Sequence, residues 1–412
     1  MKKIMILGAG SGQIPFINIC KKKGAYVIVV SPSGEYPGIE LADKYYDCDT
    51  RDKEAILDIA MNEGIDAITT DQTDVSVPSV AYVAEKMELK GIGYDCAMRF
   101  TDKYVMRCAA EKIGIPVPRF RLAHNLPEAI DKISELNIPV IIKPTNSSGS
   151  RGIHRIDSCE ELENYFCDIQ SYSSTKTVII EEFINGVEYL ADGFCMDRKY
   201  INLDVGEKEY FDKSGTYISK MCMFTSAGLA DTKIEKMVLE TNRKLVEGFG
   251  LEFGITHAEY MYCPKEDKVY LIEIAARGGG VYLSSDLTPT ASGVHTNELL
   301  LDYLLDGKKT DVDKLVLQKK VAAWRCFALN EGVISSVKNV DLLKTMEGVD
   351  RVCLESLTVG TKVEDLKNDT TKYGPILVSG NSKEECYKTI DEVVDTLKIE
   401  TIKNGKTSQI IW

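Results

Sequence analysis

The first hundred residues alternate between short apolar runs and helix-like segments. An apolar run at 4–7 leads through a glycine-rich turn into a helix pattern over 14–23. A second apolar run covers 26–30, and a third begins at Ala67 after a helix pattern over 53–62. Strands that alternate with helices in this way are typical of a parallel sheet with both faces covered. The sequence therefore predicts an α/β domain at the start of the chain.

The turn after the first strand contains Gly8, Gly10 and Gly12, a pattern also found where dinucleotides bind a helix N-terminus. The dinucleotide fingerprint, however, needs a glycine where Gln13 stands. The second strand also ends without the acidic residue that would hold a ribose. We interpret the segment as a tight strand-to-helix turn and not as an NAD site. Binding of a substrate or an anion at this turn stays open.

Three domains are predicted for the 412 residues. A break near 91–94 separates the first domain, 1–95, from a second domain over 96–310. The second begins with a helix pattern over 97–113 and includes a smaller β-rich part at about 116–194. A charged connection leads into a third domain over 311–412.

Composition excludes several classes of protein. The net charge of −13 argues against binding to nucleic acid or an anionic membrane surface. No run approaches the roughly 18 apolar residues that a membrane span needs. The twelve cysteines are scattered and form no C-x-x-C pair, which predicts reduced thiols in the cytoplasm and no zinc site.

A set of charged and small residues in the second domain predicts a nucleoside triphosphate site. Two lysines can offset phosphate charge, a small-residue loop can fold its backbone N–H groups over phosphates, and two carboxylates can hold magnesium. The members are Lys103; Lys143; the loop 147–152 with Ser148, Gly149, Ser150 and Gly152; Glu181, Glu182, Phe183, Ile184 and Glu188; and Glu259 and Glu273.

Glu259 and Glu273 are the most informative of these residues. Each interrupts an apolar strand pattern, and a buried carboxylate is costly unless a cation pairs with it. A metal ion is a common partner. The alternative is a pair of edge strands whose acids are solvated.

The order of these elements resembles the ATP-grasp superfamily over about residues 1–310. The resemblance implies that Lys103 and Lys143 contact ATP phosphates, and that Glu181, Glu182 and Ile184 meet the adenine. It also implies that Glu188 holds the ribose hydroxyls and that the two strand glutamates bind Mg²⁺, with Mn²⁺ as an alternative.

The segment from Glu273 to Arg277 is similar to the E-x-N-x-R signature of that superfamily. Ala275 replaces the usual asparagine, which puts tight binding of a second magnesium in doubt. The resemblance assigns Arg277 to the substrate carboxylate or its phosphate, a role that suits a bidentate guanidinium. The alternative is that Arg277 pairs with a structural acid.

The segments 325–328, 332–334 and 374–385 resemble the last domain of L-amino acid ligases, to which biotin carboxylase carries a related domain. The expected fold class is α/β, with α+β in the lid at 116–194. It is an ATP-grasp fold with an N-terminal Rossmann-like parallel-sheet domain and a C-terminal α+β domain. Tyr217 and Lys220 are weaker candidates for a substrate loop, and His257 is a candidate either for phosphate contact or for a hydrogen-bonded core position.

The function implied is that of an ATP-dependent carboxylate–amine ligase. It would act through an acyl phosphate on an amino acid or small carboxylate, release ADP and phosphate, and work as a cytoplasmic homodimer. Small-molecule carboxylate and amine substrates are its expected partners. One alternative is a purine-pathway enzyme acting on a phosphoribosyl amine, of the glycinamide ribonucleotide synthetase, transformylase or carboxylase type. The other two alternatives are a non-catalytic nucleotide-binding regulator and an NAD-dependent oxidoreductase.

Overall fold

The computed structural model describes residues 1–147, 149, 151–212, 218–368 and 371–412, and it divides into two compact units. The first unit comprises 1–202, 232–285 and 295–315, and the second comprises 203–231, 286–294 and 316–412. The two boundaries between the three predicted domains stay a prediction.

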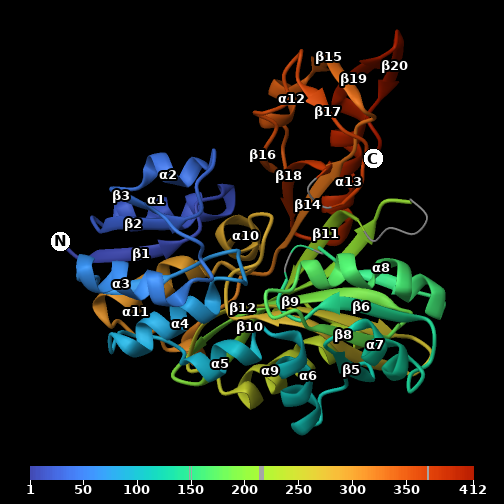
Figure 1. The fold of residues 1–412 in the computed structure, drawn as a ribbon. Helices are drawn as coiled ribbons and strands as arrows, with labels where there is room; N and C mark the ends of the chain where they lie inside the picture. Colours follow the sequence, from blue (N-terminus) through green and yellow to red (C-terminus); the bar gives the residue numbers. More distant parts are fainter. Residues whose placement is uncertain (148, 150, 213–217, 369–370) are drawn as a thin grey trace. The chain divides into compact units, whose positions relative to one another are not determined.

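The first unit opens with a four-stranded parallel sheet in the order β3-β2-β1-β4 (Figure 1). Leu7, Ile28 and Val30 pack with Ile56 of α3 and Val83 of α4 in one hydrophobic core. Helices α1 and α11 contact strands β2 and β4 of the same sheet. The alternation of strands and helices thus gives the expected covered parallel sheet. Its elements are β1 (Lys3–Leu7), α1 (Ile14–Lys22), β2 (Tyr26–Ser31), α2 (Pro37–Leu41), β3 (Lys44–Asp47), α3 (Lys53–Glu63), β4 (Ala67–Thr69) and α4 (Val77–Lys86), with α11 (Thr296–Asp306) joining from later in the chain.

The single helix predicted over 97–113 is wrong, because two helices occupy this stretch. Helix α5 (Tyr94–Arg99) ends before Asp102, and α6 (Lys103–Lys112) begins after it. Asp102 is the N-cap of α6, and its carboxylate accepts hydrogen bonds from the backbone N–H groups of Tyr104 and Val105. Such a cap satisfies N–H groups that the first helical turn leaves unpaired. The cap also fixes the direction in which α6 starts, and with it the position of Lys103.

A small antiparallel sheet in the order β5-β8-β6-β7 forms the lid. Helices α7 and α8 pack on it, and their buried residues, among them Ile133, Leu162 and Phe166, join Val140 and Ile180 of the strands in one core. The elements are β5 (Phe120–Ala123), α7 (Leu126–Ile133), β6 (Val140–Pro144), β7 (His154–Ile156), α8 (Cys159–Ser171) and β8 (Val178–Glu182).

The remaining strands of the first unit form an antiparallel run in the order β13-β12-β9-β10 (Figure 1). Helix α9, which begins with a capping box at Thr232 and Glu235, contacts β9, β12 and β13. The elements are β9 (Val187–Met196), β10 (Lys199–Tyr210), α9 (Lys233–Phe249), β12 (Phe253–Cys263) and β13 (Lys268–Ala275).

The second unit pairs the end of β10 with β11 and continues through β14, β18 and β16; a second sheet has the order β17-β15-β19-β20. Met223, Ala323, Val378 and Ile390 belong to its hydrophobic core. Its other elements are β11 (Ser219–Ser226), α10 (Thr288–Ser292), β14 (Val321–Phe327), β15 (Gly332–Lys338), α12 (Val340–Lys344), β16 (Val349–Val352), β17 (Lys362–Val363), β18 (Tyr373–Gly380), α13 (Lys383–Thr396), β19 (Lys398–Lys403) and β20 (Lys406–Gln409).

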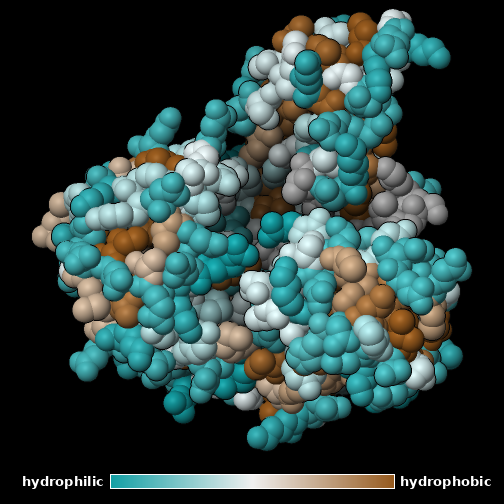
Figure 2. Space-filling model, in the orientation of Figure 1, coloured by the Kyte–Doolittle hydropathy of each residue, from teal (hydrophilic) through white to brown (hydrophobic). Residues whose placement is uncertain are grey.

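Hydrophilic residues cover much of the face in view in Figure 2, with apolar residues scattered between them. Within the described part of the chain, no helix is both long enough and apolar enough to span a membrane.

Candidate nucleotide and carboxylate site

Lys103 lies at the first position of α6 and is almost completely buried, with 3% of its surface exposed. Its Nζ donates hydrogen bonds to Glu273 Oε1 at 2.7 Å and to the carbonyl oxygen of Ser147 at 2.9 Å. Burial lowers the pKa of Lys103, but the carboxylates of Glu273 and Asp74 outweigh it and raise the pKa. The lysine is therefore a buried cation that one predicted magnesium ligand holds in place.

Lys143, near the end of β6, forms a second buried ion pair. Its Nζ lies 2.7 Å from Glu181 Oε2, and the other oxygen of this carboxylate lies 2.7 Å from Arg107 Nε. Burial would raise the pKa of Glu181, but Arg107 and then Lys143 outweigh it and lower the pKa. Burial also lowers the pKa of Lys143. The Glu181 carboxylate is thus an anion shared between two cations.

Glu259 and Glu273 lie directly opposite each other on β12 and β13, in agreement with the expected neighbouring strands. Their side chains are 27% and 26% exposed, so both reach solvent while their strands are mostly buried. Among the described residues, no three His, Cys, Asp or Glu side chains form a ready-made metal site. Two carboxylates nevertheless fit Mg²⁺, which is commonly held by one or two carboxylates together with substrate phosphates.

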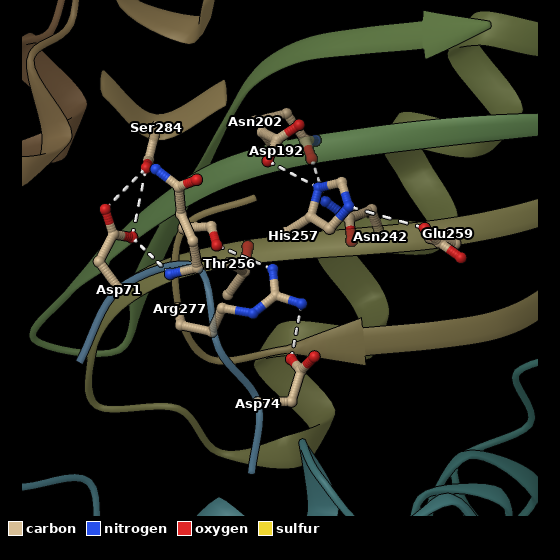
Figure 3. A network of polar contacts seen from close by, with 12 residues as sticks. Asp71, Asp74, Asp192, Asn202, Asn242, Thr256, His257, Glu259, Arg277 and Ser284 are labelled. Atoms are coloured by element: carbon tan, nitrogen blue, oxygen red, sulfur yellow. Dashed lines mark hydrogen bonds and ion pairs between the residues drawn. The ribbon is translucent and has the colours of Figure 1, made fainter. Parts of the chain in front are cut away.

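His257, on the same face of β12 as Glu259, is buried and lies between two carboxylates (Figure 3). Its Nδ1 lies 3.0 Å from Asp192 Oδ1 on β9, and its Nε2 lies 3.8 Å from Glu259 Oε1. Burial lowers the pKa of His257, but Asp192 and Glu259 outweigh it and raise the pKa to about 9. The expected hydrogen-bonded core position is therefore what the structure has, with the ring cationic at neutral pH.

Arg277 follows β13 and is held by two contacts. Nη2 lies 2.6 Å from Asp74 Oδ1 in an ion pair that Figure 3 shows, and Nη1 donates to the carbonyl oxygen of Gly278 at 2.8 Å. Burial lowers the pKa of Arg277, but Asp74 outweighs it and raises the pKa. Within the described part of the chain, the buried Nε has no hydrogen-bond partner. The guanidinium thus keeps one donor for another anion.

The turn after β13 is packed too tightly for side chains. A Cβ at Gly278 would collide with Asp71 and Ser284, and one at Gly279 would come within 2.6 Å of Leu283 and 2.9 Å of His257. Close approach of backbone to neighbouring side chains is a recurrent reason for glycine. Because Gly278 and Gly279 have no side chains, the backbone that follows Arg277 can pack closely against these neighbours.

Asp71 follows β4 and is buried beside this turn. Its carboxylate accepts hydrogen bonds from Ser284 Oγ at 3.0 and 3.2 Å and from Asn297 Nδ2 at 3.3 Å (Figure 3 shows the Ser284 contacts). Burial raises the pKa of Asp71 to about 6.

A pocket opens next to Asp71, Arg277 and Asn297. Asn297 Oδ1, buried like the rest of its side chain, has no hydrogen-bond partner among the described residues. Two residues that line the pocket therefore each carry a buried polar atom without a hydrogen-bond partner among the described residues, Arg277 Nε and Asn297 Oδ1. The apolar wall of the pocket comes from residues that include Val80, Phe253, Ile255, Leu300 and Leu304.

For the other predicted nucleotide contacts, the described part of the structure shows their neighbours but no arrangement that indicates a nucleotide. The Glu182 carboxylate accepts hydrogen bonds from Arg119 and from Asn137, and the guanidinium of Arg155 lies over the Phe183 ring. Ile184 follows β8, and Glu188 lies on β9 opposite Met261. Gly149 and Gly152 have positive φ angles of 68° and 72°, as a glycine loop allows. Ser148, Ser150 and Tyr217 lie outside the described residues, and Lys220 in the second unit pairs with Glu209. The roles of all these residues stay predictions.

Four acidic or basic residues of this site were missed from the sequence: Asp71, Asp74, Arg107 and Asp192. A signal existed for Arg107, because it follows Lys103 by four positions and so lies on the same face of α6. Asp71 and Asp74 follow strand β4, at the carboxyl edge where ligands of parallel sheets commonly bind. The side chain of Gln13, which occupies the position of the missing fingerprint glycine, donates a hydrogen bond to the carbonyl oxygen of Asp71. The Gln13 side chain thus occupies the glycine-rich turn after β1.

Comparison with known proteins identifies the central part of the chain. Residues 136–286 match the model of the ATP-grasp domain. The chain contains an ATP-grasp domain. Residues 325–401 match L-amino acid ligase C-terminal domain 2. The predicted resemblance to the ATP-grasp superfamily and to L-amino acid ligases is confirmed.

Relatives and solved structures place the ATP-grasp domain in context. Alanine–anticapsin ligase of Bacillus subtilis is 28% identical over 287 residues, which are 65% of this chain and 60% of that protein. The chain thus matches less than two thirds of that relative's length. The carbamoyl phosphate synthase large chain, C-terminal section, of Methanopyrus kandleri is 25% identical over 67% of this chain and 53% of its own length.

Two solved structures share the fold. An L-amino acid ligase from Bacillus licheniformis has a TM-score of 0.81 at 21% identity and covers 98% of this chain and 99% of its own. Phosphoribosylglycinamide synthetase from Anaerococcus prevotii has a TM-score of 0.73 at 21% identity, with 97% and 99% covered. The predicted fold class, a mixed α/β ATP-grasp fold, is confirmed.

Proposed function

We propose that the protein is an ATP-dependent ligase that joins a carboxylate to an amine. ATP would convert the carboxylate to an acyl phosphate, the amine would displace the phosphate, and ADP and phosphate would leave. Phosphoryl transfer depends mainly on positioning and electrostatics, which this arrangement of charges can supply.

The observation that carries the proposal is that two buried lysines and two facing glutamates lie within or directly beside the ATP-grasp domain: Lys103 on α6 pairs with Glu273 inside it. Lys103 and Lys143 are held as buried cations, which suits a polyphosphate. Glu259 and Glu273 lie opposite each other on the neighbouring strands β12 and β13 and suit Mg²⁺. In this proposal Glu182, Ile184 and Glu188 bind the nucleoside. Glu181, which was also assigned to the adenine, is buried between Arg107 and Lys143, and its contact with the adenine stays a prediction.

The pocket beside Arg277 supports a small carboxylate, such as an amino acid, as the substrate. Arg277 Nε can donate to a carboxylate oxygen, and Asn297 Oδ1 can accept from a donor such as an ammonium group. The apolar wall fits a small apolar side chain.

Measurement of ADP release from Mg-ATP with a panel of amino acids, alone and in pairs, tests the proposal. We expect release to require a carboxylate and to rise when a second amino acid supplies the amine. Release that depends on a phosphoribosyl amine would instead identify a purine-pathway enzyme. ATP binding without release under any condition would identify a regulator.

A further inference from the structure

Arg107 is the one fully buried arginine in the described core of the first unit, and none of the proposed steps uses it. Its exposed fraction is 0%, and it lies on α6 one turn after Lys103. Its Nη2 donates to the carbonyl oxygen of Ile272 at 2.6 Å, the residue before Glu273 on β13. Its Nε lies 2.7 Å from Glu181. The guanidinium is thus fixed to the backbone of β13 and cannot leave Glu181 without losing that anchor.

Lys143 differs from Arg107 in this respect. Its ammonium contacts the opposite oxygen of the same carboxylate, at 2.7 Å. Arg107 and Lys103 both repel its charge, which acts with burial to lower the pKa of Lys143. Burial and two neighbouring cations therefore disfavour the charge of Lys143, which an additional anion would stabilise.

We propose that Arg107 is a positioning residue that releases Lys143 to the nucleotide. When a phosphate arrives, Lys143 turns from Glu181 toward it, while Arg107 keeps the Glu181 carboxylate neutralised. An ionised carboxylate left buried without a cation is costly, so without Arg107 the glutamate would hold Lys143 back. This inference rests on the proposed nucleotide site.

Binding of Mg²⁺ with a non-hydrolysable ATP analogue, measured by calorimetry, tests the proposal in the full-length protein. We expect Arg107→Met to raise the Kd of the analogue by about tenfold or more, within the range of coupling between contacting charges. The Kd of adenosine, which has no phosphate, should change by less than about threefold on the same scale. Arg121→Met removes an arginine of the lid that pairs with Glu135 and is more exposed than Arg107; it serves as the control and should leave both values unchanged.

The double variant Arg107→Met/Glu181→Gln separates positioning from a merely structural role. Removal of the carboxylate leaves nothing to retain Lys143, so the Kd of the analogue should return to within about threefold of the wild-type value. If loss of Arg107 only damages the fold, the second change cannot restore affinity, and that result would overturn the proposal.

Glu181→Gln alone keeps the proposal testable if Arg107→Met does not fold. Because Glu181 was also assigned to the adenine, the Kd of adenosine serves as the internal reference for this variant. We expect the ratio of the analogue Kd to the adenosine Kd to stay at or below its wild-type value, and a rise of this ratio by about tenfold or more at an unchanged melting temperature would overturn the proposal. Failure of the wild-type protein to bind the analogue would overturn the proposed function itself. Normal wild-type binding with an unaffected Arg107→Met variant would overturn only the role of Arg107.

Discussion

At the scale of single residues, most of the donor nitrogens of Arg277 already have a partner within the protein. One terminal nitrogen pairs with Asp74, the other donates to Gly278, and Nε remains for a ligand. The alternative that Arg277 pairs with a structural acid is therefore what the structure has, whereas its role toward a substrate carboxylate stays a prediction. The Asp74 carboxylate fixes the orientation of the guanidinium. The geometry of the guanidinium, and not only its charge, should therefore affect how well the substrate binds.

Arg277→Lys tests this point, because lysine keeps the charge and loses the planar fork. We expect kcat/KM for the carboxylate substrate to fall at least about tenfold, equivalent to roughly 1.4 kcal/mol of transition-state binding. The Kd of Mg-ATP, measured separately by calorimetry, should change little. A loss of ATP affinity at normal carboxylate dependence would move Arg277 to the nucleotide site.

Asp71→Asn tests the buried carboxylate next to the pocket. Since burial raises the pKa of Asp71 to about 6, the folded protein holds a proton there that the unfolded chain has already lost. The group therefore favours folding less as pH rises from about 4 to about 6. Relative to the wild type, Asp71→Asn should gain on the order of 1 kcal/mol of stability between pH 5 and pH 7.5. Denaturant unfolding of both proteins at the two pH values measures the difference, and a constant difference would contradict the raised pKa.

At the scale of elements, the pair β12–β13 carries the proposed metal site. The register places Glu259 opposite Glu273, and His257 opposite Ala275 and Asp192. An irregularity follows Glu259, where the pairing shifts by one residue. Bulges of this kind re-aim side chains at sheet edges and near functional sites. The hydrogen-bonded pairing of β12 with β13 therefore itself places the two carboxylates opposite each other.

Glu273→Gln should lower turnover by orders of magnitude and leave the fold intact. The change removes a charge that holds both Lys103 and the proposed magnesium ion but keeps the size of the side chain. ADP release gives the turnover, and circular dichroism checks the fold. Ala275→Asn, which restores the usual signature, should keep or tighten the dependence on magnesium. Near-normal activity of Glu273→Gln would place the metal elsewhere.

The sequence could predict which strands carry the site residues better than it could predict which side chains form ion pairs there. Apolar patterning predicted the strands of Lys143, Glu259 and Glu273, because each of these residues lies in a short apolar run that is mostly buried. The ion pairs of Arg277 with Asp74 and of Arg107 with Glu181 join segments distant in the chain, and local patterning carries no information on such contacts. The break between α5 and α6 was overlooked because one capping carboxylate, Asp102, outweighs a continuous helical pattern.

At the scale of the whole molecule, ligand binding should appear as a gain in stability. A ligand that binds only the folded chain stabilises it by roughly 2.7 kcal/mol at a hundredfold excess over Kd. We expect Mg-ATP to raise the melting temperature, because we propose that Lys103 and Lys143 contact its phosphates. NADH should not do so, since Gln13 fills the turn that a dinucleotide would need. A shift with NADH and none with Mg-ATP would refute the nucleotide assignment. Homodimer formation stays a prediction, which sedimentation velocity can check.

The crowded turn at Gly278 and Gly279 has a consequence for engineering the enzyme. Any side chain placed there would push Asp71, Ser284 or His257 out of position, so variant libraries that include these two positions would mostly yield damaged protein. Ile255, Leu300 and Leu304, by contrast, line the pocket with apolar side chains of their own. Selection for new substrates should therefore diversify these three residues and keep the two glycines constant.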